Sequence, residues 1–168
     1  MHMADALLSP AVGGVMWVAA AGTLAYSATK LSKGDLEDLD NPKSISFDKK
    51  IPLMGVLGAF VFASQMINFT IPGTGSSGHI GGGILLASLL GPEAGFLTIA
   101  SVLVIQCLFF ADGGLLALGC NMINMGFFAC FIGFPFIYKK ILKNGFTPTK
   151  IMIASIISVV ISLQLGAF

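Results

Sequence analysis

Long, uninterrupted apolar runs dominate the sequence and limit what the chain can fold into. They cover residues 11–31, 51–69, 84–91, 94–111, 115–138 and 151–168. About 20 apolar residues are enough for a helix to cross the hydrocarbon core of a bilayer. Only 10% of the chain is charged, and its mean hydropathy is +0.91, so it could not cover a water-exposed surface. The sequence predicts an all-α integral membrane protein and excludes a soluble enzyme, a disordered chain and a nucleic-acid binder.

The lysines predict how the chain is oriented. All nine basic residues are lysines; they flank a first loop with Lys30, Lys33, Lys43, Lys49 and Lys50 and a last loop with Lys139, Lys140, Lys143 and Lys150. Basic loops stay on the cytoplasmic side. We therefore expect one transmembrane domain over residues 1–168, with about six helices and the N-terminus outside. Residues 32–50 form a cytoplasmic linker and residues 70–83 an outer Gly-rich loop, and the short third segment, 78–91, is either a span or re-entrant.

The two ends of the sequence carry separate predictions. No lysine precedes Lys30, and the first apolar run is too long for the hydrophobic part of a signal peptide. We expect the first run to be retained and Met1 to carry a free α-amino group on the outer side. The sequence stops at Phe168, at the end of an apolar run. This predicts either an end in the membrane interface or a truncated C-terminus.

His2 stands at a position with a specific chelating chemistry. The Met1 amine, the His2 amide nitrogen and the His2 imidazole Nδ1 can bind one metal through a five-membered and a six-membered ring. These three nitrogens lie nearly in one plane, and a fourth nitrogen would complete the square geometry that suits Ni(II) or Cu(II). The alternative is that His2 is an N-terminal residue without a role.

His79 is the only other histidine and is the candidate fourth ligand. The predicted topology places it on the same side as His2, at the mouth of a span, where ionisable groups are scarce and often functional. Taken alone, a histidine in a loop is usually an ordinary polar side chain, and it is this context that favours a ligand. It follows a GxGxxG sequence, residues 73–78, but no βαβ unit surrounds this sequence, so we reject a dinucleotide site.

Four other residues are candidates for supporting the metal from outside its ligand set. Asp5 and Asp112 are outer-side acids, and a carboxylate can orient a ligating imidazole; Asp112 could instead cap a helix. Asn121, like Asn124, lies in an apolar stretch and should face the protein interior, where it bonds either the N-terminal segment or another helix. Met122 is a candidate for the pocket wall. The three cysteines are interpreted as apolar filler.

These residues resemble a known family. The first ten residues, MHMADALLSP, together with SGHIGGG at 77–83 and ADGGLLALGCNM at 111–122, are similar to the cobalt and nickel substrate-binding proteins CbiM and NikM. The resemblance covers essentially the whole chain. Residues 3–5, Met-Ala-Asp, depart from the family pattern but keep the acid.

The resemblance implies a bundle of the S-component type, the substrate-specific part of an energy-coupling factor ABC transporter in the cytoplasmic membrane. It also implies high-affinity uptake of Co²⁺ or Ni²⁺, held by Met1, His2 and His79. The metal is then the transported substrate, and no cofactor is expected. The implied partners are a membrane coupling (T) component and cytosolic ABC ATPases, with room for a small accessory membrane subunit.

Two features of the sequence bear on function. The chain has no GxxxxGK[ST] sequence, so ATP hydrolysis must come from separate subunits. Ala21 and Ala25 form a small-xxx-small pair suited to helix docking or to packing within the chain. The alternative function is a membrane-embedded metalloenzyme that uses His79 and Asp112 with Glu93. A metal channel is not expected, because it would need rings of acidic residues along the spans and the spans lack them. The sequence does not choose between cobalt and nickel.

Overall fold

The structure is a computed structural model that describes residues 3, 5–37, 47–72, 76–143 and 145–167. Within these residues, four helices are long and apolar enough to cross a membrane: Pro10–Lys33, Pro92–Phe110, Leu118–Leu142 and Pro148–Gly166. A fifth apolar stretch, Lys50–Met66, belongs to a 20-residue helix. The predicted all-α membrane architecture is confirmed.

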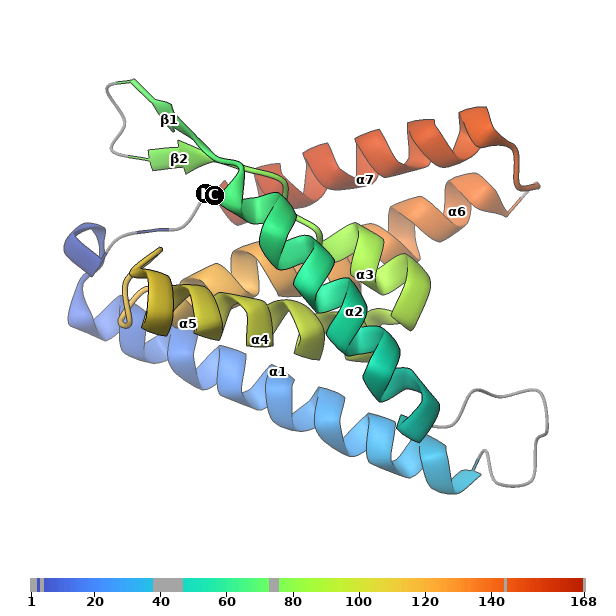
Figure 1. The fold of residues 1–168 in the computed structure, drawn as a ribbon, viewed down its shortest axis with the longest axis horizontal. Helices are drawn as coiled ribbons and strands as arrows, with labels where there is room; N and C mark the ends of the chain where they lie inside the picture. Colours follow the sequence, from blue (N-terminus) through green and yellow to red (C-terminus); the bar gives the residue numbers. More distant parts are fainter. Residues whose placement is uncertain (1–2, 4, 38–46, 73–75, 144, 168) are drawn as a thin grey trace.

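The elements follow one another in an order close to that of the apolar runs (Figure 1). After a 3₁₀ turn at Asp5–Leu7, they are α1 (Pro10–Glu37), α2 (Phe47–Met66), β1 (Phe69–Ile71), β2 (Ser76–Gly78), α3 (Gly83–Leu90), α4 (Pro92–Phe110), α5 (Leu118–Asn121), η3 (Met122–Tyr138), α6 (Lys139–Leu142) and α7 (Pro148–Ala167). Segments α5, η3 and α6 form one continuous helix, whose η3 part is wound as a π-helix and contains Pro135.

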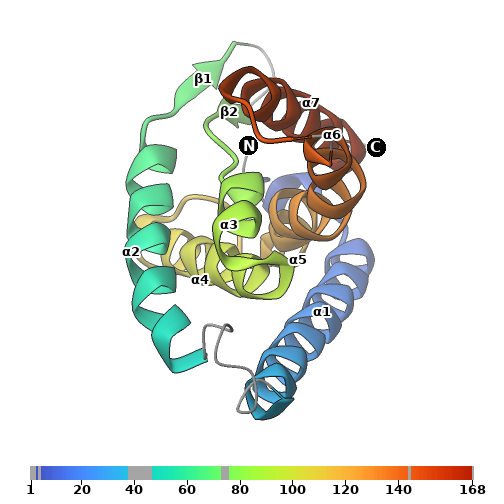
Figure 2. The same ribbon diagram turned by 90° about the vertical axis from the view of Figure 1, so that its right-hand side faces the viewer.

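Helix α4 lies at the centre of the bundle and contacts α1, α2, α3 and η3. Its buried residues include Phe96, Ile99 and Leu103, each 0% exposed. Figure 2 shows α3 between α2 and α7, with α1 on the opposite side of the bundle. Burial of these apolar side chains against one another fixes the order of the helices around α4.

Helix α3 has only eight residues, a length of about 12 Å at 1.5 Å per residue. A hydrocarbon core of about 30 Å is too thick for such a helix to cross alone. Gly91, at φ 88°, ends it, and Pro92 begins α4 at the first helical position, where a proline costs no hydrogen bond. Helix α3 is thus too short to be a span by itself, and α4 follows it directly.

Helices and strands extend into both predicted loops. The linker expected at residues 32–50 is helical at both ends, because α1 continues to Glu37 and α2 begins at Phe47. The Gly-rich loop expected at 70–83 contains an antiparallel hairpin, in which Phe69 pairs with Gly78 and Ile71 with Ser76. Gly83, its last expected residue, is already the first of α3.

The two ends of the bundle differ in charge. The Asp5–Leu7 turn, the hairpin and the start of α5 lie at one end, on the left in Figure 1. The end of α1, the start of α2 and the connection from α6 to α7 lie at the other, and these segments carry the lysines of the described residues. There Lys30 of α1 also pairs with Glu93 of α4. The lysines thus lie at the other end of the bundle from the β1–β2 hairpin, which His79 follows in the chain.

Candidate metal centre

His79 lies between β2 and α3, and its residue is 9% exposed. Its Nδ1 is 3.0 Å from the carbonyl oxygen of Ile80. A carbonyl can only accept a hydrogen bond, so Nδ1 carries the proton and the lone pair of the ring lies on Nε2. Burial lowers the pKa of His79, although the Ile80 carbonyl and the negative charge of Asp112 act in the opposite direction. A buried, neutral imidazole with its lone pair on Nε2 is in the form that binds a metal.

The glycines after His79 allow its loop to enter between helices. Gly82 has φ 80°, in the left-handed region that suits glycine. A Cβ there would also lie 2.6 Å from Cγ1 of Val61 on α2. At Gly83, a Cβ would lie 2.6 Å from the carbonyl oxygen of Met125 on η3. The Gly-Gly-Gly sequence therefore lets the backbone beside His79 approach α2 and η3 closely.

The N-terminal segment is bonded to the start of the α5–η3 helix. The amide of Met3 donates to Oδ1 of Asn121 at 2.9 Å, and the amide of Gly114 donates to the carbonyl of Met3 at 3.2 Å. Nδ2 of Asn124 lies 3.8 Å from the Met3 sulfur. Of the two roles considered for Asn121 and Asn124, the structure shows contact with the N-terminal segment.

Asp5 continues this attachment. Its Oδ1 accepts a hydrogen bond from the amide of Ala117 at 2.8 Å, and its carbonyl accepts one from Leu8 at 3.1 Å. Gly114 lies directly under Asp5, and a Cβ there would overlap the carboxylate. Asp5 thus anchors the segment that follows the predicted ligands.

Asp112 lies in the turn that closes α4. Its amide donates to the carbonyl of Gln106 at 3.1 Å, and Ala111 before it is in the left-handed conformation with φ 51°. The negative charge of Asp112 raises the pKa of His79, so the two residues interact electrostatically. Met122, by contrast, is 2% exposed and belongs to the apolar core, together with Leu118 and Met125.

The predicted ligands Met1 and His2 lie outside the described residues. Within the described part of the chain, no group of three His, Cys, Asp or Glu residues could hold a metal ion. This region therefore supplies one imidazole, His79, and the bonds that hold Met3 and Asp5. The trio of His79, Asp112 and Glu93 required by the enzyme hypothesis is not a cluster in it.

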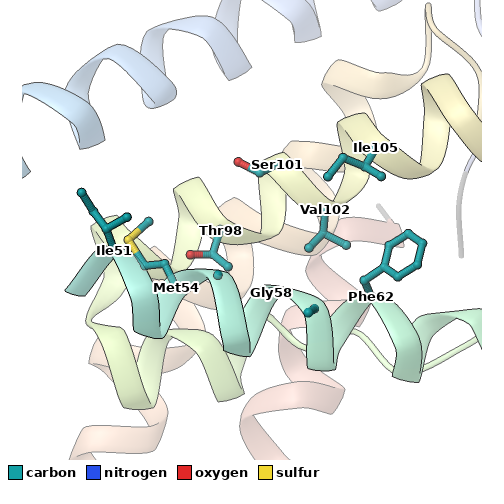
Figure 3. Close-up of a pocket in the computed structure, with 10 residues that line it drawn as sticks. Ile51, Met54, Gly58, Phe62, Thr98, Ser101, Val102 and Ile105 are labelled. Carbon is teal, nitrogen blue, oxygen red and sulfur yellow. The ribbon is translucent and has the colours of Figure 1, made fainter. Parts of the chain in front are cut away.

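A hollow of about 510 Å³ between α2 and α4 has a different chemistry (Figure 3). Met54, Gly58 and Phe62 of α2 face Val102 and Ile105 of α4 across it. Thr98 and Ser101 bring hydroxyl groups, but each donates to a carbonyl of its own helix. With no nitrogen or carboxylate ligand in its lining, this hollow is no metal site.

Sequence analysis did not single out two fully buried glutamines. Gln65 on α2 and Gln106 on α4 are 0% exposed and are bonded to each other. Both stand inside apolar runs, where a polar side chain is costly and signals a function or a bonded partner. That signal was available in the sequence and would have identified them.

The fold and the site together define a multi-pass membrane protein with one buried imidazole and a tethered N-terminal segment towards one end of the bundle. Residues 2–168 match the CbiM family, described as the cobalt uptake substrate-specific transmembrane region. The chain belongs to this family. Its members are transport components and not enzymes, so the metalloenzyme alternative is not supported.

Individual relatives agree with this assignment. A putative fused nickel transport protein, NikMN, of Archaeoglobus fulgidus is 40% identical over 141 residues, which are 84% of this chain and 42% of that protein. A cobalt transport protein, CbiM, of Geobacter sulfurreducens is 29% identical over 145 residues, 86% of this chain and 39% of that protein. The chain thus spans about two fifths of the length of these curated relatives.

A solved structure supports the fold. A crystal structure described as that of a transition metal transporter superposes with a TM-score of 0.82 at 35% identity. The match covers 99% of this chain and 66% of that one. The arrangement of helices found here is therefore shared with a transition metal transporter.

Proposed function

We propose that this chain binds Co²⁺ or Ni²⁺ at the outer face of the cytoplasmic membrane, as the substrate-specific component of an energy-coupling factor transporter. The observation that carries the proposal is the attachment of Met3 and Asp5 to Asn121, Gly114 and Ala117. A segment held by its own backbone directly after Met1 and His2 limits where the first two residues can reach. A ligand set that includes the chain terminus needs such an anchor.

The proposed ligands are the Met1 amine, the His2 amide and imidazole, and Nε2 of His79. Asp5 and Asn121 hold the N-terminal segment, Asp112 adds negative charge near His79, and Met122, a buried core residue, is proposed as part of the pocket wall. Four nitrogens in a plane favour Ni(II) by geometry. Co(II) is included because a relative is named as a cobalt transport protein. The metal is the cargo of the protein.

The proposed transport cycle depends on partners. The chain contains no phosphate-binding loop for ATP, so a coupling component and ABC ATPases would supply the energy. Ala21 and Ala25 on α1 are exposed, whereas Ala20 and Ser27 are buried. The small-residue pair therefore faces away from the bundle, as a surface for docking a partner helix requires. With the lysine-bearing end in the cytoplasm, the proposed site faces outward.

The decisive experiment changes the position of the terminal amine. Three alanines added before Met1 place the amine too far from His2 for the two to share small chelate rings, and they are expected to abolish tight binding of Ni(II) and Co(II). The control is three alanines inserted after Phe146, which is 79% exposed and lies between α6 and α7, at the lysine-bearing end. Binding is measured by titrating purified protein that carries an authentic Met1, with the two metals in competition. Normal binding by the extended protein would refute the chelate.

Substitution of the imidazoles tests the rest of the ligand set. His2→Ala is expected to remove the imidazole nitrogen and with it the six-membered chelate ring, and His79→Ala removes the fourth nitrogen. Both variants should lose metal in equilibrium dialysis. If both retained one metal per chain at unchanged affinity, the site would have to lie elsewhere.

A further inference from the structure

The two buried glutamines form a chain of hydrogen bonds that ends at the loop of His79. Nε2 of Gln106 on α4 donates to Oε1 of Gln65 on α2 at 2.9 Å. Nε2 of Gln65 then donates to the carbonyl of Gly81 at 2.8 Å. Buried amides are expensive unless they are bonded, so this pair binds α4, α2 and the loop into one unit.

The carbonyl that Gln65 holds is adjacent to the one that orients His79. The Ile80 carbonyl accepts from Nδ1 of His79, and the next carbonyl along the chain is that of Gly81. A Cβ at Gly81 would meet only Leu163, at 4.0 Å, so this position has no side-chain packing of its own to hold it. Glycine has wide conformational freedom. The bond from Gln65 therefore restrains the peptide plane beside the one that orients the imidazole.

Gln106 extends the same unit to Asp112. Its backbone carbonyl accepts the amide of Asp112 at 3.1 Å and also that of Ala111. One residue thus holds the Asp112 turn with its main chain and, through Gln65, the His79 loop with its side chain. The relative placement of His79 and Asp112 depends on this arrangement.

We propose that Gln65 and Gln106 are positioning residues that hold the His79 imidazole with Nε2 directed at the metal. The inference rests on the proposed function, because it assigns to the glutamines a role towards a ligand of that site. It goes beyond the ligand set by making metal affinity depend on two side chains on spans α2 and α4. Residues that orient a ligating histidine commonly change metal affinity by about 10- to 100-fold when they are replaced.

The test is a double-mutant cycle between Gln65 and His79. Gln65→Met keeps the size of the side chain but cannot donate to Gly81. We expect it to weaken Ni(II) binding by about tenfold or more and to alter the Ni(II) absorption spectrum. In a His79→Ala background, the same change should have no further effect on the residual affinity, because there is no imidazole left to orient. Equal losses in both backgrounds would overturn the positioning role.

A matched control separates positioning from general destabilisation. Thr98 is 4% exposed on α4 and bonds to Ala94 of its own helix. Thr98→Val thus removes a buried polar group without touching the loop, and it should leave metal affinity and spectrum unchanged. If Gln65→Met does not fold, Gln106→Met provides the same cycle while leaving the bond between Gln65 and Gly81 in place. If Gln106→Met causes the same loss of metal affinity with and without His79, the proposal is overturned as well.

The failure of this inference can be distinguished from failure of the proposed function. If His79→Ala binds metal like the unaltered protein, the ligand set is wrong and the glutamines have nothing to position. If His79→Ala loses affinity while Gln65→Met and Gln106→Met do not, the ligand set stands and only the positioning role is refuted.

Discussion

Replacing Gly114 by alanine should displace the N-terminal segment without changing any charge or proposed ligand. The added Cβ would overlap the carboxylate of Asp5 and lie 2.6 Å from its backbone nitrogen. Ordinary contact begins at 3.4 Å, so Asp5 and the segment attached to it would have to move by about 1 Å. A displacement of this size is large enough to impair a binding site. The substitution therefore tests whether the anchoring of this segment matters for metal binding.

The expected magnitude follows from the bonds at risk. The amide of Gly114 donates to Met3 at 3.2 Å, and the amide of Ala117 donates to Asp5 at 2.8 Å. Each such bond contributes about 1 kcal/mol net. If both are lost, the attached conformation is disfavoured by about 2 kcal/mol, which corresponds to roughly a 30-fold loss in affinity. Isothermal titration with Ni(II) or Co(II) would measure it.

Gly14→Ala is the matched control for this experiment. It adds the same methyl group on α1, where nothing lies within 4 Å, and alanine favours a helix over glycine by about 1 kcal/mol. This variant should bind metal as the unaltered protein does and be at least as stable. If Gly114→Ala also bound metal with unchanged affinity, the attachment of residues 3–5 could not be what positions the terminal ligands.

Three further predictions address neighbouring parts of the site. Asn121→Ala leaves the Met3 amide without its 2.9 Å acceptor and should weaken metal binding by about tenfold, a cost of about 1–3 kcal/mol, in the same titration. Asp112→Asn should lower the pKa of His79 still further, because the charge of Asp112 raises it; NMR titration of the imidazole in metal-free protein would show this, and an unchanged or higher value would contradict it. Gly82→Ala should lower the melting temperature, because φ 80° and Val61 both oppose a side chain there, whereas Gly55→Ala, with nothing within 4 Å, should not.

The helices could be predicted from the sequence because a bilayer requires long apolar runs. The boundaries at the lysine-bearing end could not, since Leu, Lys and Glu after residue 31 are compatible with both a helix and a polar linker. The hairpin at Phe69–Gly78 was missed for a related reason. Its second strand, Ser76–Gly78, contains no β-branched or aromatic residue and ends in Gly, which is depleted in strands. Its pairing with Phe69–Ile71 depends on contacts that composition does not reveal.

For the candidate site, the ligands could be predicted from the sequence, whereas the groups that support them could not. Its ligands are prominent in the sequence because the chain has only two histidines and one of them stands beside the terminal amine. The groups that hold them are distant in sequence: Asn121 is 118 residues from Met3, and Gln106 is 41 residues from Gln65. Such pairs arise from the order of the helices around α4, which no local pattern encodes.

The N-terminal segment and the His79 loop are attached to different helices. The N-terminal segment is bonded to the start of the α5–η3 helix, whereas the His79 loop is bonded to α2 and α4 through the glutamines. The two halves of the proposed ligand set are therefore carried by different helices. A shift of α4 relative to η3, which pack against each other, would separate them, so metal affinity should depend on how α4 and η3 pack. Cross-linking α4 to η3 should then slow metal release, and unchanged release would show that the two halves move together.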